Sequence, residues 1–188
     1  IVITSALRTA IGALDGSLKQ KQAHDLGSVV IKEVIKKSNL NPNEIDEIIM
    51  GQVYTGGVGQ NPARQAAINA GLPIEKTAYL INQVCGSGLR SVAAGYQSII
   101  SNDSKIIIAG GQESMSNANH ITLRQHQARD EGSNSMMKDG LYDAFNNYHM
   151  GVTAENVAEK WGISRKEQDD FALSSQLKAE KSIKEKKF

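Results

Sequence analysis

The sequence has few of the features that stabilise or anchor a protein from outside its own core. Its one cysteine, Cys85, cannot form a disulfide within the chain, which favours a reducing compartment. Uninterrupted apolar runs are short, as at residues 106–109, so we expect no segment that spans a membrane. The formal charge of +1 provides no overall field that would attract nucleic acid. We therefore expect a cytoplasmic protein without nucleic-acid or membrane partners.

Signatures of metal and nucleotide binding are also lacking. The four histidines are scattered and, with a single cysteine, give no metal-ligand spacing. The glycine-rich residues 56–59 follow a predicted strand, but Pro62 stands where a dinucleotide-binding loop needs its third glycine. No Walker-type phosphate loop occurs in the sequence. We expect neither a bound metal nor a redox cofactor.

The first 110 residues alternate short apolar runs with amphipathic patterns at helical spacing. Such an alternation predicts an α/β fold with a mostly parallel sheet and crossover helices. The isoleucine-rich run at 105–109 is typical of a strand that is buried on both faces. The predicted strands are residues 1–4, 45–53, 78–84 and 105–109, and the predicted helices begin near Asp25, Pro62 and Gly86.

The character of the sequence changes after Gly111. Residues 112–150 are rich in serine, asparagine, glutamine and methionine and have weak periodicity. This predicts either a long loop or a small excursion from the fold, and long segments of this kind are usually functional. Ser164 and Glu167 have the spacing of a capping box and predict a helix that runs to about Lys184.

Cys85 is notable for its position between a predicted strand and a predicted helix. At such a junction the sulfur lies near the unpaired N–H groups of the helix, which favour a thiolate, the nucleophilic form. The N–H groups of Gly86-Ser87-Gly88 are candidate donors to an oxyanion. A lone cysteine is also commonly a small buried hydrophobic residue, so the residues alone leave both interpretations open. Among the histidines, His149 is the strongest candidate for a base, since it lies where order resumes after the irregular stretch.

Residues 82–89, which surround Cys85, are similar to the nucleophile motif of the thiolase family. Further matches to the family occur in the right order, which is far more specific than any single motif. The resemblance covers nearly the whole chain and leans toward the acetyl-CoA acetyltransferase branch. The supporting matches are residues 5–12, 59–65, 109–116, 139–141 and 149–156.

The resemblance implies a layered αβαβα fold made of two similar halves. It divides this chain into the first half-domain, which carries the nucleophile, at residues 1–115, and the beginning of an inserted loop domain at residues 116–188. In the family, Cys85 would take the acyl group from acyl-CoA as a thioester. Leu141, His149 and Met150 would line the pantetheine and acyl pocket, which makes His149 a pocket wall rather than a base.

The implied activity is condensation of two acetyl-CoA molecules to acetoacetyl-CoA and CoA, or the reverse thiolysis, by a dimer or tetramer. CoA thioesters would be substrates, with no further cofactor. One alternative is a thiolase for longer 3-ketoacyl-CoA chains. A second alternative follows from the length, about half that of a full thiolase. The histidine that activates the nucleophile and a second cysteine are expected in a half that this sequence does not contain. The chain would then be a catalytically incompetent piece that only dimerises or binds CoA.

Overall fold

The computed structural model describes residues 1–122 and 133–187. The chain divides into two compact units, Ile1–Gly140 and Leu141–Phe188, and each is described by itself. The sequence predicts a boundary between two domains of the family after residue 115. That boundary is of a different kind from the division into compact units, and it stays a prediction.

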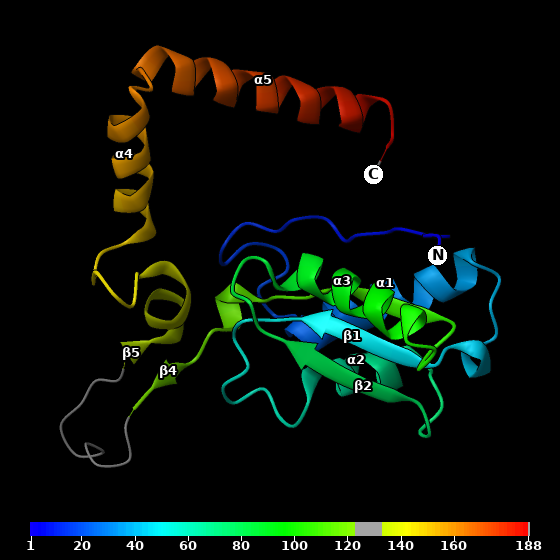
Figure 1. Ribbon diagram of the computed structural model, residues 1–188. Coiled ribbons are helices and arrows are strands. Elements are labelled where there is room, and N and C mark those ends of the chain that lie inside the picture. Colours follow the sequence, from blue (N-terminus) through cyan, green and yellow to red (C-terminus); the bar gives the residue numbers. More distant parts are fainter. Residues whose placement is uncertain (123–132, 188) are drawn as a thin grey trace. The chain divides into compact units, whose positions relative to one another are not determined.

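The first unit is built on a parallel sheet with the strand order β2-β1-β3 (Figure 1). Its strands are β1 (Glu47–Gly51), β2 (Thr77–Ile81) and β3 (Ile107–Gly111). The central strand β1 pairs in parallel with both neighbours, so that all three strands end at the same edge. The prediction of an α/β fold with a parallel sheet and crossover helices is confirmed.

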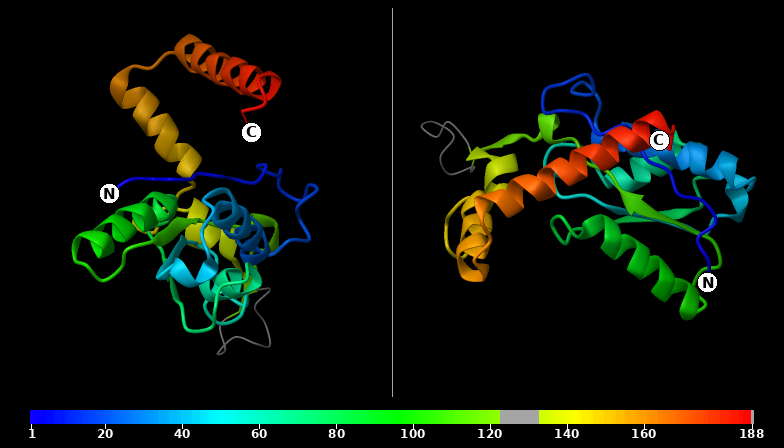
Figure 2. Two further views of the ribbon diagram at one scale, coloured as in Figure 1. Left: turned by 90° about the vertical axis from the view of Figure 1, so that its right-hand side faces the viewer. Right: turned by 90° about the horizontal axis from the view of Figure 1, so that it is seen from above.

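Helices cover both faces of this sheet (Figures 1 and 2). The core cluster joins α1 (Ala23–Lys37) and α2 (Pro62–Asn69) to the side chains of Ile48 and Met50 on one face of β1. Gly51 lies on the alternate face, against the first residues of α3 (Ser87–Ile100). The sheet is therefore packed between α3 and the pair α1 and α2.

The helix starts follow from local sequence. Asn61 accepts a hydrogen bond from the backbone of Arg64, and Pro62 occupies the first turn of α2, as its sequence predicts. Ser164 and Glu167 form the predicted capping box of α5 (Arg165–Lys184). The predicted extent of that helix is confirmed at both ends.

The predicted strand at residues 1–4 is wrong. These residues form no secondary structure, and Ile1, Val2 and Ile3 are 60%, 81% and 79% exposed. A strand requires backbone hydrogen bonds to a neighbour, and within the described residues neither outer strand of the sheet, β2 or β3, pairs with residues 1–4. The apolar pattern alone therefore did not suffice to form a strand.

The irregular stretch after β3 is a small excursion rather than a plain loop. A 3₁₀ turn at Met115–Asn117 leads into a two-stranded antiparallel pair, β4 (His120–Ile121) with β5 (Ser133–Asn134). A π-helical turn, η4 (Met136–Leu141), follows. Residues 123–132 of the predicted excursion lie outside the described residues.

The second unit contains α4 (Met150–Trp161) and α5. Gly162, which follows α4, has a φ of 65° and takes the left-handed conformation that ends the helix. In the part of the chain that the structure describes, no helix has the length and apolar character to cross a membrane.

Replacement of Asp46 by asparagine tests how the sheet is fixed at the end where its strands begin. One Asp46 carboxylate oxygen accepts the backbone N–H groups of Lys105 and Ile106, at 2.7 and 3.0 Å. These bonds lower the pKa of Asp46 from its usual 3.8. Asparagine can accept the same bonds without the charge, so we expect Asp46→Asn to lower the free energy of unfolding by about 1 kcal/mol near pH 7.

The pH dependence gives the control for this substitution. A lowered pKa in the folded state contributes stability above the unfolded-state value of 3.8, and this contribution is lost as the pH falls through the lower folded-state value. The difference between Asp46→Asn and the wild type should therefore shrink below pH 3.8 in urea unfolding. Asp103→Asn, at an exposed carboxylate, should change stability by less than about 0.5 kcal/mol. A difference that is constant with pH would contradict the assignment.

Candidate active site

The residues that follow the three strands meet at one edge of the sheet. Because β1, β2 and β3 are parallel and in register, the segments beginning at Gln52, Asn82 and Gln112 lie side by side. In open parallel sheets this carboxyl-terminal edge is where ligands bind. Cys85 belongs to the second of these segments, so the sequence-predicted nucleophile lies at the edge where chemistry is expected.

Cys85 lies in a tight turn between β2 and α3. The N–H groups of Gly86 and Ser87 donate to the carbonyls of Gln83 and Val84, both at 3.0 Å. The thiol is free and exposed, so the interpretation of Cys85 as a buried hydrophobic residue is wrong. The predicted strand–cysteine–helix junction is present, whereas the catalytic role of the sulfur stays a prediction.

This turn changes one expectation about the oxyanion donors. Two of the three candidate N–H groups, those of Gly86 and Ser87, already donate hydrogen bonds within the turn. Ser87 reinforces the same turn with its side chain, which is 4% exposed. Its hydroxyl accepts the Gln83 N–H at 2.8 Å and donates to the Val84 carbonyl at 2.5 Å. The N–H groups of Gly86 and Ser87 therefore stabilise the turn itself.

The turn holds Val84 in an uncommon backbone conformation. Val84 has a φ of 48°, in the left-handed region that β-branched residues rarely adopt. Such conformations persist where the surrounding bonds determine them, and they cluster at functional sites. Two hydrogen bonds hold Val84 in this conformation immediately before Cys85. The Val84 N–H donates to the side chain of Asn82, and the Val84 carbonyl accepts the hydroxyl of Ser87.

Close approach of α3 to the sheet depends on a glycine. A Cβ added to Gly51 would overlap the backbone of Ser87 and Gly88. A side chain at Gly51 would thus push the first turn of α3, and the Cys85 turn with it, away from the end of β1. Sequence reasoning missed Gly51, although a glycine at the end of a predicted buried strand is a signal of close backbone approach.

A buried glutamine pair joins the ends of β1 and β3. Gln112, 6% exposed, donates its side-chain amide to Gln52, 1% exposed, at 2.8 Å. Gln52 in turn donates to the carbonyl of Tyr54 at 2.8 Å. Gly27 of α1 leaves room for the Gln112 side chain, because a Cβ added at Gly27 would overlap the Gln112 amide. Buried polar groups that are bonded in this way fix one arrangement of the strand ends.

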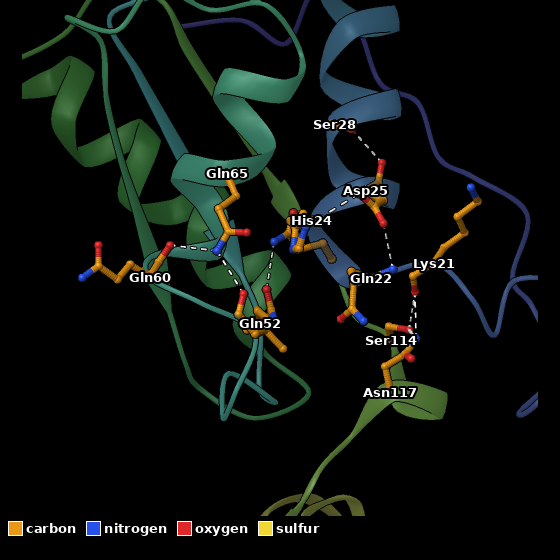
Figure 3. Close-up of polar contacts among 12 residues, drawn as sticks. Lys21, Gln22, His24, Asp25, Ser28, Gln52, Gln60, Gln65, Ser114 and Asn117 are labelled. Carbon is orange, nitrogen blue, oxygen red and sulfur yellow. Dashed lines mark hydrogen bonds and ion pairs between the residues drawn. The ribbon is translucent and has the colours of Figure 1, made fainter.

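The loop after β3 also holds the chain that enters α1. Ser114 and Asn117 donate their side-chain hydrogens to the carbonyl of Lys21, at 2.7 and 2.9 Å (Figure 3). Gln22, the residue before α1, caps the helix, and its N–H donates to the carboxylate of Asp25 at 3.0 Å. These contacts anchor the loop next to the candidate site to the body of the unit.

Glu113 is the charged side chain at the same edge. Its carboxylate accepts the N–H of Val53 at 2.7 Å and the N–H of Tyr54 at 3.4 Å. Burial raises the pKa of Glu113. Burial also raises the pKa of the Tyr54 phenol, and the charges of Glu113, Cys85 and Asp139 raise it further.

The three residues predicted to line the acyl pocket, Leu141, His149 and Met150, belong to the second unit, whereas Cys85 belongs to the first. His149 caps α4, because its Nδ1 accepts the N–H of Gly151 at 2.9 Å. Its ring meets that of Tyr142 edge to face, with 5.8 Å between the ring centroids. Met150 begins α4 and is 36% exposed, while Leu141 immediately precedes Tyr142. A nitrogen committed to capping suits a pocket wall better than a base, and the pocket role of these residues stays a prediction.

The described residues contain one free thiol, that of Cys85. Within them, no three or more histidine, cysteine, aspartate or glutamate side chains are grouped so that they could hold a metal ion.

Comparison with known proteins identifies the family of this chain. The family model described as Thiolase, N-terminal domain, matches residues 1–188. This chain belongs to the thiolase family. It is 52% identical to the acetyl-CoA acetyltransferase of Rhizobium meliloti (strain 1021), over all of this chain and 49% of that protein. It is 54% identical to the acetyl-CoA acetyltransferase of Paracoccus denitrificans, again over all of this chain and 49% of that protein.

A third relative carries a different name. The probable acetyl-CoA acyltransferase of Staphylococcus aureus (strain COL) is 49% identical over 95% of this chain and 47% of that protein. The chain thus spans about half the length of the curated relatives that it matches. The α/β fold of the first unit is that of a thiolase N-terminal domain.

Substitution of Ser87 tests how the Cys85 turn is held. Ser87→Ala removes both the acceptor for the Gln83 N–H and the donor to the Val84 carbonyl at a buried position. We expect the free energy of unfolding to fall by about 1–3 kcal/mol in urea unfolding, because buried polar groups lose their partner. Ser101→Ala, at an exposed hydroxyl at the other end of α3, should change it by less than about 0.5 kcal/mol. Equal effects of the two substitutions would show that Ser87 does not hold the turn.

Proposed function

We propose that this chain supplies the acyl-accepting half of an acetyl-CoA acetyltransferase, with Cys85 as the nucleophile. The observation that carries the proposal is the exposed thiol of Cys85 in the turn that begins α3, at the carboxyl-terminal edge of the sheet. The names and identities of the relatives support the substrate class, an acyl-CoA thioester. A free thiol that must stay reduced suits a cytoplasmic location.

The first step of the proposed reaction transfers an acetyl group to sulfur. The Cys85 thiolate attacks the carbonyl carbon of acetyl-CoA, a new carbon–sulfur bond forms, and the bond to CoA breaks. CoA leaves as a thiolate and takes up a proton. The helix N-terminus next to Cys85 favours the negative charge on the sulfur before the attack.

The second step forms the carbon–carbon bond. A second acetyl-CoA loses a methyl proton to a base, and the resulting carbanion attacks the thioester carbonyl, which releases acetoacetyl-CoA and restores the Cys85 thiolate. One sulfur cannot be thioester and base at once, and the sequence has a single cysteine. We therefore assign this step to the assembly of this half with a thiolase second half.

The acyl pocket is assigned to Leu141, His149 and Met150. Support comes from their proximity along the chain and from the Tyr142 contact that orients the His149 ring. A longer 3-ketoacyl-CoA substrate would require a larger pocket at these positions, so the acyl-chain preference separates the two thiolase activities. The proposed assembly is a homodimer or tetramer. Exposed apolar side chains on α3, such as Leu89 at 78% and Ile100 at 60%, favour a partner layer over that helix.

Acetylation of Cys85 tests the proposed nucleophile. Incubation with acetyl-CoA should add one acetyl group to the chain, and peptide mapping should find it on Cys85. Cys85→Ser should abolish the label, because a serine hydroxyl is a far weaker nucleophile than a thiolate. The measurement is made on the 188-residue chain alone and after mixing with the second half of the Paracoccus denitrificans relative. Acetyl on a different residue, or on none under either condition, would sink the assignment.

Truncation of Met150 tests the acyl pocket. Met150→Ala shortens a side chain of the proposed pocket and so enlarges the pocket without touching the nucleophile, so it should shift the preference toward longer acyl chains by roughly 10-fold or more. The measurement compares the rates of Cys85 labelling by acetyl-CoA and by longer acyl-CoA thioesters. Val157→Ala, at an exposed position further along α4, serves as the control. If Met150→Ala instead abolishes labelling by every thioester while the fold survives, the division of roles is wrong.

A further inference from the structure

Glu113 is a charged group at the Cys85 edge that the proposed reaction does not use. Burial of a carboxylate is costly unless hydrogen bonds compensate for it, and Glu113 accepts the N–H groups of Val53 and Tyr54. A carboxylate bonded to two successive main-chain amides fixes the direction of the chain at that point. Its location therefore points to a role in placing Tyr54.

Tyr54 is held at three points and reaches across the edge of the sheet. Its N–H is bonded to Glu113, and its carbonyl accepts the side chain of Gln52 at 2.8 Å. Its hydroxyl donates to the carbonyl of Met136 at 3.1 Å. A Cβ added to Gly140 would overlap this hydroxyl, so the phenol ring lies directly on residues 136–140. All of these residues belong to the first unit.

The same edge contains the Cys85 turn. The Val53 carbonyl accepts the side-chain amide of Asn82 at 3.5 Å, and Asn82 accepts the N–H of Val84 at 2.9 Å. The segment that Glu113 fixes thus contacts the nucleophile turn on one side and residues 136–140 on the other. Gly140 immediately precedes Leu141, to which the proposed function assigns part of the acyl pocket.

We propose that Glu113 and Tyr54 are positioning residues that hold the segment leading into the acyl-binding loop beside the Cys85 turn. Glu113 fixes the main chain at Val53 and Tyr54, and the Tyr54 hydroxyl passes this constraint to residues 136–140. The gain is preorganisation: a segment that is already ordered costs less to order when acyl-CoA binds. The inference rests on the proposed function for its consequence, and on the hydrogen bonds alone for its structural part.

Removal of the Tyr54 hydroxyl tests the structural part. Tyr54→Phe keeps the ring and deletes the bond to Met136, so amide hydrogen exchange in residues 133–140 should accelerate by about threefold to tenfold. Exchange in residues 82–87 should stay unchanged, because the main-chain bonds of Tyr54 are intact. Tyr79→Phe, on the edge strand β2, is the matched control and should leave both segments unchanged. Unaltered exchange at residues 133–140 in Tyr54→Phe would overturn the proposal.

Replacement of Glu113 tests the other end of the connection. Glu113→Gln keeps the size of the side chain but presents an N–H₂ group toward one of the two amides, so it should accelerate exchange at residues 53–54 and at residues 133–140 together. Glu75→Gln makes the same chemical change at an exposed position and should alter neither segment. Acceleration confined to residues 53–54 would contradict the connection through Tyr54. If Glu113→Gln does not fold, the Tyr54→Phe comparison decides.

Two reactions of the single cysteine separate positioning from catalysis. In Tyr54→Phe, alkylation of Cys85 by iodoacetamide should keep its wild-type rate, because the thiol is untouched. The acetyl-CoA concentration for half-maximal Cys85 labelling should rise by the same factor of about threefold to tenfold, with the limiting rate unchanged. A fall in the limiting rate or in alkylation would overturn the positioning role. If wild-type Cys85 takes no acetyl group, the proposed function fails, while hydrogen exchange still decides the structural part.

Discussion

The in-register pairing of β1 with β2 and β3 is the constraint on which the rest of the first unit depends. Parallel strands that start together also end together, so three segments with different sequences emerge at one edge. Their polar groups cannot all reach water, because α3 covers one face and α1 and α2 cover the other. They bond to one another instead, through the Gln52–Gln112 pair and through Glu113. These bonds fix one arrangement of the strand ends, while the side-chain oxygen of Gln112 is buried without a partner among the described residues.

The nucleophile turn depends on how closely helix and sheet approach. Gly51 lets the first turn of α3 lie against the end of β1, and Ser87 closes the loop over Val84. The left-handed backbone at Val84 is held by these neighbours and not by its own preference. The result is an exposed thiol in a turn whose chain is fixed on either side of it. This combination is what a nucleophile that forms a covalent intermediate requires.

The exposed apolar side chains have a pattern as well. In the first unit they include side chains of α3 and of residues 1–3, and in the second unit they lie on α4 and α5. A layered thiolase with a second half offers a natural cover for such a surface, and the relatives are about twice as long as this chain.

The sequence by itself determined the features that arise within a few residues. Apolar runs predicted the parallel sheet, Pro62 and Ser164 marked helix starts, and the position of Cys85 before Gly86 predicted the strand–turn–helix junction. Only the tertiary structure decided which side chains surround the junction. The Glu113 and Val53 bond spans 60 residues, and the Tyr54 and Met136 bond spans 82. Caps and periodicity are local properties that a sequence displays directly, whereas such distant partners meet only after the strands have paired.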